Sequence, residues 1–401
     1  MTRIKILLPA LLAVLCLMGA DAETFRYAYT KGEKYRVLSK VFEAVFVNGI
    51  FSHQADILNR IAVEVTDVHG GSGDHAVSYQ TSERAYGSSN TYEWSEEYGS
   101  VFSRDELGRY TIDPSYFMPV VRDVPLMAEQ DVKPGQSWTA EGSEVHDFRR
   151  SFGIEKAFHF PTSVGYTYLR DERYKGLRCA VIGIRYNVFH RITDVPRTAK
   201  TYPTRITGTS DQKLWWDLDN HREVYYEEEF DFIYTLASGQ EIEYEGSANA
   251  EVIDAQPLNK PKMVEDIRKD IEKIPDASVR QDETGVTITL ENVNFPPNSF
   301  ELLPQEKDKL RRIAEILNKY PDRDILVTGF TARAAGYTEE EYQYLSEMRA
   351  KAAGDYLLSL GVRKAEQLTS KGMGSRNPIG SNDSEEGMRK NRRVEITILE
   401  N

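Results

Sequence analysis

Residues 391–399 read Asn-Arg-Arg-Val-Glu-Ile-Thr-Ile-Leu, and they follow a segment that contains Gly372, Gly374 and Pro378. The run from Arg393 onward is rich in β-branched and apolar residues, which predicts a closing strand. Glycine and proline favour turns, so the segment before this strand is predicted to be a loop. We therefore expect the chain to end in a folded unit in which a Gly-rich loop leads into a final strand.

Strand and helix patterns alternate before this closing strand, from residue 277 onward. One helix places apolar residues at i, i+3, i+4 and i+7 from Leu310, which is the spacing of an amphipathic helix. A second helix opens with the capping-box pair Thr338 and Glu341. The predicted strands are 286–293, 324–329, 367–371 and 393–399, and the predicted helices are 304–320 and 338–360. Helices packed on one sheet make this region an α/β sandwich.

The same region carries a set of motifs in a fixed order. They are Asn294-Phe295, Ser299, Leu302, Thr328-Gly329, Leu345-Ser346, Arg349-Ala350, Leu360-Gly361-Val362, Gly372, Gly374, Pro378-Ile379, Asn382 and the closing Asn-Arg-Arg-Val-Glu of residues 391–395. In this order they resemble the OmpA-like (OmpA/MotB C-terminal, peptidoglycan-associated) family over residues 277–401. The closing motif after a Gly-rich loop is the most specific part of the resemblance.

The resemblance implies a groove for peptidoglycan. In family members that bind peptidoglycan, the groove captures the diaminopimelate residue of the stem peptide, whose free end has an ammonium and a carboxylate. Recognition of that end needs a carboxylate and a guanidinium at a fixed separation. In the family these are the Asp of a Gly-His-Thr-Asp loop and the Arg of a Leu-Ser-x-x-Arg-Ala helix.

Five positions of this chain are candidates for binding peptidoglycan. Arg349 matches the guanidinium of the helix motif, and Thr331 matches the threonine of the loop. Asn391 and Arg392 match the C-terminal pair near the groove, and Arg333 is a further cation on the carboxylate side. We expect these residues to form any surviving cell-wall site.

Three other positions diverge from the family pattern. Phe330 stands where the loop histidine is expected, Ala332 replaces the aspartate that binds the ammonium, and Tyr342 replaces a helix asparagine. Loss of one partner of a desolvated charge pair costs about 2 to 5 kcal/mol. The domain is therefore expected either to bind peptidoglycan weakly or with altered chemistry, or to have lost this binding and act as a structural or docking module.

Residues 23–252 have a β-rich pattern. In 180–192 and 223–234, apolar and aromatic residues alternate with charged ones, as in a sheet with one buried and one wet face. This predicts an antiparallel, strongly curved sheet or sandwich, and the length also allows two subdomains. A helix is expected somewhere within 116–131.

A linker is predicted between the two regions. Pro257 and Pro261 block both helix and central strand, and a short charged helix is predicted over 263–273. The expected domains are a β-rich domain at 23–252, a linker with a short helix at 253–276 and an OmpA-like domain at 277–401. The fold class is therefore α+β and multidomain.

The N-terminus predicts export. Arg3 and Lys5 precede an apolar run, and Ala20-Asp21-Ala22 offers a cleavage site, so residues 1–22 are predicted to be a signal peptide. Leu15 before Cys16 argues against lipidation at that cysteine. We expect an exported protein of the periplasm, associated with the outer membrane. Cleavage would leave Cys179, in an alternating apolar run, as a buried thiol.

The composition and motifs argue against several functions. With 50 Lys and Arg against 63 Asp and Glu, the net charge is −13, which disfavours nucleic acid and anionic membrane surfaces. The seven histidines have no metal-ligand spacing, and no nucleophile elbow or phosphate loop is present, so neither an enzyme, a cofactor nor a metal is expected. Glu227-Glu228-Glu229 is interpreted as a solvated acidic edge, with Glu228 on the opposite face of the strand.

The β-rich region leaves two alternatives of a different class. Its many aromatic residues would suit a groove for a lipid, a peptide or another envelope protein. Outer-membrane protein A, which names the family, places a membrane β-barrel before its OmpA-like domain, and this region could supply enough strands for one. Stretches such as 95–109 and 241–249 lack the apolar band that a lipid-facing barrel needs, so a soluble periplasmic domain is favoured.

Overall fold

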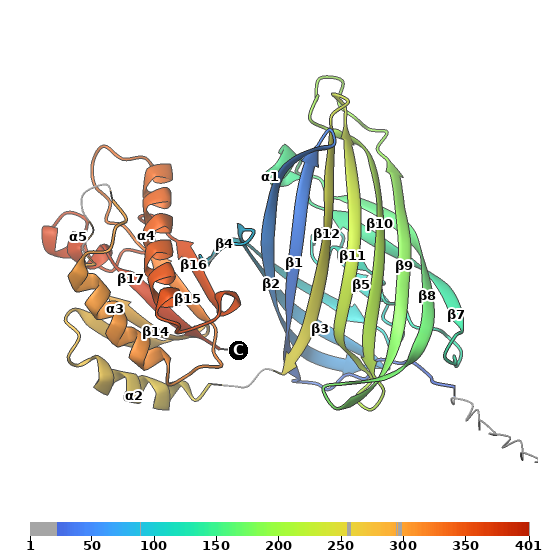
Figure 1. Ribbon diagram of the computed structural model, residues 1–401, viewed down its shortest axis with the longest axis horizontal. Helices are drawn as coiled ribbons and strands as arrows, with labels where there is room; N and C mark the ends of the chain where they lie inside the picture. Colours follow the sequence, from blue (N-terminus) through green and yellow to red (C-terminus); the bar gives the residue numbers. More distant parts are fainter. Residues whose placement is uncertain (1–21, 89, 255–257, 294, 296–298, 401) are drawn as a thin grey trace, which may run out of the picture.

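The computed structural model describes residues 22–88, 90–254, 258–293, 295 and 299–400. The predicted signal segment, apart from residue 22, and Cys16 lie outside the described residues. The described chain forms two lobes, one built from β1 to β12 and one from α2 to β17 (Figure 1). Within the described chain, no helix combines the length and apolar character needed to cross a membrane.

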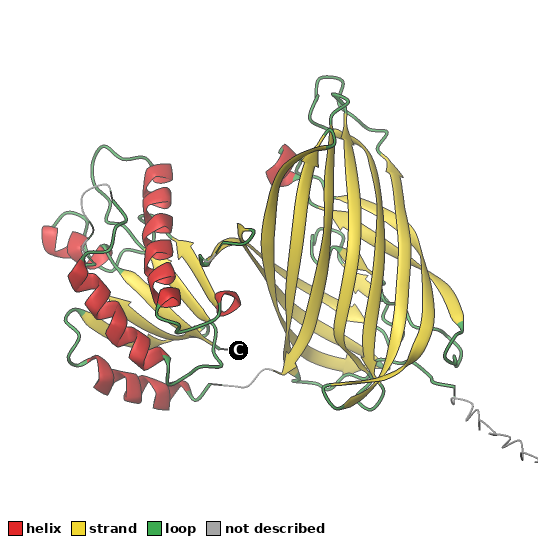
Figure 2. Ribbon diagram, in the orientation of Figure 1, coloured by secondary structure: helices red, strands yellow, loops and turns green. Residues whose placement is uncertain are grey.

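The first lobe is a curved antiparallel sheet that is not closed. Its strand order is β5-β4-β3-β2-β1-β12-β11-β10-β9-β8-β7-β6, and β5 and β6 each pair on one side only. The larger strands are β1 Lys34–Val47, β2 Ile50–His69, β3 Ser72–Ala85, β4 Tyr92–Arg104, β7 Ser137–His146, β8 Phe158–Tyr174, β9 Leu177–Arg191, β10 Pro203–Asp217, β11 Arg222–Leu236 and β12 Glu241–Asp254. The short strands are β5 Tyr110–Ile112 and β6 Val121–Arg122. The strands curve strongly, and the sheet curls back toward itself (Figure 2).

The core of this lobe lies on the concave side of the sheet. The predicted apolar face of β9, from Ala180 through Ile184 to Val188, is buried there with Phe25 and Trp138, whereas Arg185 points outward and is exposed. This alternation confirms the face predicted for residues 180–192. Period-two alternation therefore allows one sheet to enclose its own core.

Trp215 and Trp216 lie on opposite faces of β10, because consecutive side chains of a strand point to opposite sides. Trp216 is fully buried in the main core, and Trp215 lies in a smaller cluster with Cys179 and Val181. Burial raises the pKa of the Cys179 thiol to about 11, so this thiol stays protonated and unreactive at neutral pH.

Two local predictions were wrong. The alternation predicted over 223–234 puts Val224 on the same face as Tyr226, but a register shift between β10 and β11 places it in the smaller cluster with Trp215. No helix lies within 116–131, where Pro119 and Pro125 interrupt the chain and only the short strand β6 forms. A short helix that the sequence did not predict, α1 Arg149–Phe152, follows β7 instead.

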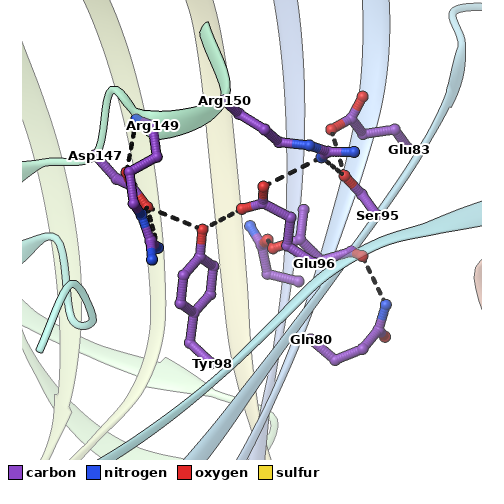
Figure 3. Close-up of polar contacts among 10 residues, drawn as sticks. Gln80, Glu83, Ser95, Glu96, Tyr98, Asp147, Arg149 and Arg150 are labelled. Carbon is purple, nitrogen blue, oxygen red and sulfur yellow. Dashed lines mark hydrogen bonds and ion pairs between the residues drawn. The ribbon is translucent and has the colours of Figure 1, made fainter. Parts of the chain in front are cut away.

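Side chains span the open edge of the sheet, between β4 and the segment after β7 (Figure 3). Arg150 donates to Ser95 Oγ at 2.6 Å and lies 3.2 Å from Glu96 Oε1. The Tyr98 hydroxyl donates to Asp147 Oδ2 at 3.2 Å. Polar side chains thus connect two edges that no backbone ladder joins in the described strands.

The second lobe is an α/β sandwich. Its sheet has the order β13-β14-β17-β15-β16, in which β15 and β16 are parallel, and α2, α3 and α4 cover one face (Figure 2). The strands are β13 Ala277–Gln281, β14 Gly285–Leu290, β15 Ile325–Gly329, β16 Leu368–Gly372 and β17 Val394–Leu399. The helices are α2 Lys260–Ile271, α3 Pro304–Leu317, α4 Glu339–Ser359, the 3-10 helix η1 Ala365–Gln367 and α5 Glu385–Asn391.

Most of these elements were predicted from their local patterns. The stripe of α3, with Leu310, Ile313 and Leu317, packs on the sheet, and Thr338 and Glu341 form the predicted capping box. The strand β13 and the helix α5 were not predicted, because each is short and polar. The predicted α/β sandwich is present.

The two lobes contact each other through β4. Its first residues pair in parallel with the edge strand β16, with Tyr92 opposite Thr369 and Glu93 opposite Ser370 (Figure 1). The Thr91 backbone N–H donates to Asp355 Oδ1 at 2.7 Å. Sheet pairing therefore extends across the domain junction and covers the edge of β16.

A charged contact beside this ladder also joins the lobes. The side chain of Arg60 is nine-tenths buried, and its guanidinium donates to Asp324 Oδ2 at 3.1 Å and to Thr369 Oγ1 at 2.9 Å. It also donates to the carbonyl oxygen of Glu366 at 2.6 Å, and Arg36 approaches the same aspartate at 3.4 Å. The lobes therefore share a docking surface in addition to the linker.

Replacing Arg60 should loosen this docking surface. In an Arg60→Ala variant, Asp324 keeps only the longer contact to Arg36, so we expect a loss of about 2 to 3 kcal/mol in docking free energy. Small-angle X-ray scattering of the mature chain should then give a broader distribution of distances. Lys40→Ala removes the more exposed pair with Glu366 and should change the scattering little. Identical scattering for both variants would contradict the inferred role of Arg60.

Candidate functional site

The candidate residues gather at one edge of the second lobe. Gly329 at the end of β15 pairs with Gly372 at the end of β16 and with Val394 at the start of β17. The loops 330–338 and 373–384 therefore leave the sheet side by side, because parallel strands end at the same edge. The first half of α4 packs behind these loops. We call this region the loop edge.

Two glycines bring α4 close to the sheet at this edge. A Cβ on Gly329 would lie 2.2 Å from the carbonyl oxygen of Ser346, and one on Gly372 would lie 2.5 Å from the backbone nitrogen of Glu347. The buried Ser346 hydroxyl accepts from the Gly374 N–H at 2.8 Å and donates to the Gln343 carbonyl at 2.8 Å. The Leu-Ser motif thus joins the helix to the loop after β16.

Arg349 is a buried cation at this edge. The residue is 9% exposed, and its Nε lies 3.4 Å from the carbonyl oxygen of Ser299 while its guanidinium lies 4.7 Å from the centre of the Phe295 ring. Burial, together with the positive charge of Arg392, lowers the pKa of Arg349 to about 10. The group is still charged at neutral pH. Among the residues that the structure describes, no carboxylate oxygen lies within 4.0 Å of it.

The other two candidate cations have partners inside the domain. Arg333 is exposed and pairs with Glu339, and its backbone N–H donates to Asn382 Oδ1 at 3.0 Å. Arg392 is one-third exposed and pairs with Glu385 at 2.6 Å. Arg349 therefore differs from both in being buried without an anionic partner in the described chain.

Asn391 hydrogen-bonds the backbone of the loop after β16. Its Oδ1 accepts from the N–H groups of Ile379 and Gly380 at 2.8 and 2.9 Å. Its Nδ2 donates to the Gly380 carbonyl at 2.8 Å and to Asn382 Oδ1 at 2.9 Å. All four hydrogen-bonding positions of the amide are used, so Asn391 holds this loop against the start of β17.

Two of the three positions expected to differ from the family pattern, Phe330 and Tyr342, are packing positions in this structure. Phe330 is buried beneath the guanidinium of Arg393, which lies 3.5 Å from the ring centre. The buried Tyr342 hydroxyl accepts from the Ala334 N–H at 2.7 Å and donates to the Ala334 carbonyl. Aromatic side chains at these positions hold the loop 330–338 against the domain.

The loop itself presents one unused polar atom. Thr331 is 5% exposed, and its backbone N–H donates to the Gly374 carbonyl at 2.9 Å. Its Oγ1 is buried and has no hydrogen-bond partner among the described residues. Ala332, the next residue, is half-buried and carries no polar group. The loop edge therefore combines an unpaired hydroxyl with the uncompensated cation of Arg349.

Arg393 is a structural residue that the sequence analysis did not single out. It is 3% exposed, bonds Glu395 Oε1 at 2.8 Å and donates to the Asn377 carbonyl at 3.1 Å. Glu395 also pairs with Arg280 of β13 at 2.7 Å. The closing motif already contains the ion pair of Arg393 with Glu395, because an arginine and a glutamate two residues apart in a strand lie on the same face.

Comparison with known proteins identifies a family for the second lobe. Residues 294–392 match the OmpA family. The chain carries an OmpA-like domain. This confirms the resemblance inferred from the ordered motifs.

Several relatives are similar to this domain alone. The chain is 34% identical over 125 residues to the Probable lipoprotein YiaD of Escherichia coli. The aligned residues make up 29% of this chain and 56% of that protein. It is 37% identical over 106 residues to the Peptidoglycan-binding protein ArfA of Mycobacterium tuberculosis. Those residues make up 26% of this chain and 32% of that protein. A solved outer membrane protein of Borrelia burgdorferi is 37% identical over 31% of this chain and 96% of that chain, with a TM-score of 0.26. The chain thus spans about a third to a half of these curated relatives.

The close approach of α4 to the sheet can be tested at Gly329. In a Gly329→Ala variant the new methyl group would overlap the backbone of α4, so we expect the free energy of unfolding of the OmpA-like domain to fall by about 1 to 3 kcal/mol. Urea denaturation followed by circular dichroism measures this change. Gly99→Ala on β4, where a Cβ meets no atom within 4 Å, is the control. Equal stability of both variants would contradict the packing argument.

Proposed function

We propose that this protein is a non-enzymatic periplasmic protein of the cell envelope whose OmpA-like domain associates with peptidoglycan through the loop edge. The observation that carries the proposal is the buried, uncompensated guanidinium of Arg349. A cation out of water without an anion is costly, and a ligand carboxylate that paired with it would recover part of that cost. The name of the similar mycobacterial protein, which describes it as peptidoglycan-binding, supports this ligand class.

The carboxylate side of the stem peptide is the side that this domain recognises. Arg349 pairs with the ligand carboxylate, and the unpaired Thr331 hydroxyl hydrogen-bonds the ligand at the same edge. Asn391 shapes the edge, whereas Arg392 and Arg333 are already paired with Glu385 and Glu339.

The position expected to bind the ligand ammonium carries no carboxylate. Ala332 offers neither charge nor hydrogen bond, so the ligand ammonium stays paired with water or is absent from the preferred ligand. An unpaired charge of this kind costs about 2 to 5 kcal/mol, which is one to several decades in affinity. The domain is therefore a weaker cell-wall binder than a member with the aspartate.

We place the β-domain in the aqueous periplasm. The outer faces of β9 to β12 carry charges near the middle of the strands, including the pairs of Arg185 with Asp211 at 2.7 Å and of Lys213 with Glu227 at 2.9 Å. Charges on a lipid-facing strand cost about 2 to 4 kcal/mol each near the bilayer midplane. This surface favours water over lipid and supports the periplasmic assignment above the membrane-barrel alternative.

Co-sedimentation with isolated peptidoglycan tests the proposed site. The mature chain should co-sediment, and Arg349→Ala should lower the bound fraction about tenfold or more because the ligand carboxylate loses its partner. Ala332→Asp should raise binding, because it returns an anion for the ligand ammonium. Arg333→Ala, at an exposed cation that already has a partner, is the matched control and should bind nearly as well as the natural chain.

The same experiment separates the two alternatives. If the natural chain stays in solution and Ala332→Asp restores co-sedimentation, the domain has lost cell-wall binding and serves as a docking module. Circular dichroism of Arg349→Ala, with Arg349→Lys as a second variant, establishes that loss of binding does not come from loss of folding.

A further inference from the structure

An open cavity lies in the β-domain beside α1, and it is independent of the proposed function. Its volume is about 360 Å³, and residues of β1, β6, β7, β9, β11 and β12 line it together with α1. Volumes of roughly this size accommodate a small organic ligand. Four carboxylate residues line this cavity: Glu43, Glu144, Asp147 and Glu228. Asp147 is paired with Arg149, which leaves Glu43, Glu144 and Glu228 without an arginine or lysine partner among the described residues.

Glu228 is the middle residue of the acidic triplet on β11. Its carboxylate accepts from the Ser210 hydroxyl at 2.6 Å and from Gln212 Nε2 at 3.1 Å, and it lines the cavity. Glu229, its neighbour, is exposed on the outer face, and Glu227 pairs with Lys213 there. Strand alternation thus separates one glutamate of the triplet from the solvated pair and directs it inward.

Glu144 provides an unused acceptor in the same cavity. The residue is 1% exposed, and its Oε2 lies 2.6 Å from His146 Nε2. The other ring nitrogen of His146 lies 2.8 Å from the Tyr234 hydroxyl. Glu144 Oε1 is buried and has no hydrogen-bond partner among the described residues. A buried carboxylate oxygen without a donor is costly, and a ligand donor would relieve that cost.

The charge balance of the cavity is negative. None of its lining residues is a lysine or an arginine, and His146 is the one basic side chain among them. Burial and the nearby Glu83 raise the pKa of Glu43 to about 7, and burial together with Glu144 raises the pKa of Glu228. These carboxylates therefore lack compensating cations, and a bound cation would stabilise their charged forms.

Aromatic side chains form the rest of the wall. Phe148, Phe232, Tyr234 and Tyr244 line the cavity, and aromatic faces attract cations, most strongly where water is excluded. No group of three or more metal-ligating side chains is assembled in the described part of the chain, so a bare metal ion does not fit. Carboxylates among aromatic rings are suited to an organic cation.

We propose that this cavity binds a primary ammonium group carried on a small apolar body. The ammonium would donate to the free Oε1 of Glu144 and face Glu228, and the apolar body would pack on the aromatic wall. A primary ammonium has three N–H donors, whereas a trimethylammonium has none and would leave Glu144 Oε1 unsatisfied. This predicts an order of preference among otherwise similar ligands.

Calorimetric titration of the mature chain with three probes tests the proposal. 2-Phenylethylamine should bind, its N-trimethylated analogue should bind about tenfold more weakly, and 2-phenylethanol should give no detectable binding. Equal binding of the amine and the alcohol would overturn ammonium recognition. No binding of the amine at millimolar concentration would overturn the site.

Variants then assign the site to the cavity. Glu228→Gln and Glu144→Gln should each weaken binding of 2-phenylethylamine about tenfold or more. Glu229→Gln removes the same charge from the neighbouring, exposed position and should leave binding unchanged. Because Glu144 is buried and its variant could lose the fold, Glu228→Gln is the deciding variant. Binding that survives Glu228→Gln but falls in Glu229→Gln would place the ligand on the outer surface and overturn the proposal.

Discussion

The close packing of α4 on the parallel pair β15 and β16 is the constraint on which the second lobe depends. Only glycine fits at Gly329 and Gly372, because a Cβ at either position would meet the backbone of the helix. This packing sets where the two loops leave the sheet and where Arg349 lies relative to them. The other edge of β16 pairs with β4, so the same strand also connects the domain to the β-domain.

The loop 330–338 is held to the domain by aromatic side chains. Phe330 and Tyr342 bury aromatic area and anchor the loop, so they stabilise the edge that polar residues would otherwise leave open to ligand. Arg349 has kept its charge although burial lowers its pKa and no anion in the described chain compensates it. A purely structural helix position gains nothing from such a cation, so the buried charge supports the proposed ligand site at the loop edge.

The β-domain separates its charges by strand alternation. Opposite charges pair across the outer faces of β9, β10 and β11, while inward carboxylates such as Glu144 and Glu228 lie among aromatic rings. The same residue type is thus solvated on one face and desolvated on the other. The energetic difference between the two faces comes from the removal of water inside the curved sheet.

Local patterns in the sequence determined the elements and the family. Alternation identified the buried face of β9, helical spacing and the capping box identified α3 and α4, and the closing motif identified the OmpA-like domain. Each of these signals lies within a few residues, because hydrogen bonding and side-chain direction repeat locally along a strand or helix. The same local reasoning placed a helix within 116–131 and missed the register shift at Val224, where prolines and strand pairing overrode the pattern.

Tertiary structure alone decided how the parts meet. The contact of Arg60 with Asp324 joins residues 264 positions apart, and the ladder between β4 and β16 joins two domains. The cavity around Glu144 combines residues from six strands and a helix, and the absence of an anionic partner for Arg349 in the described chain depends on every element around it. Such contacts leave no local periodicity in the sequence, since their energy depends on burial and geometry that exist only after the chain has folded.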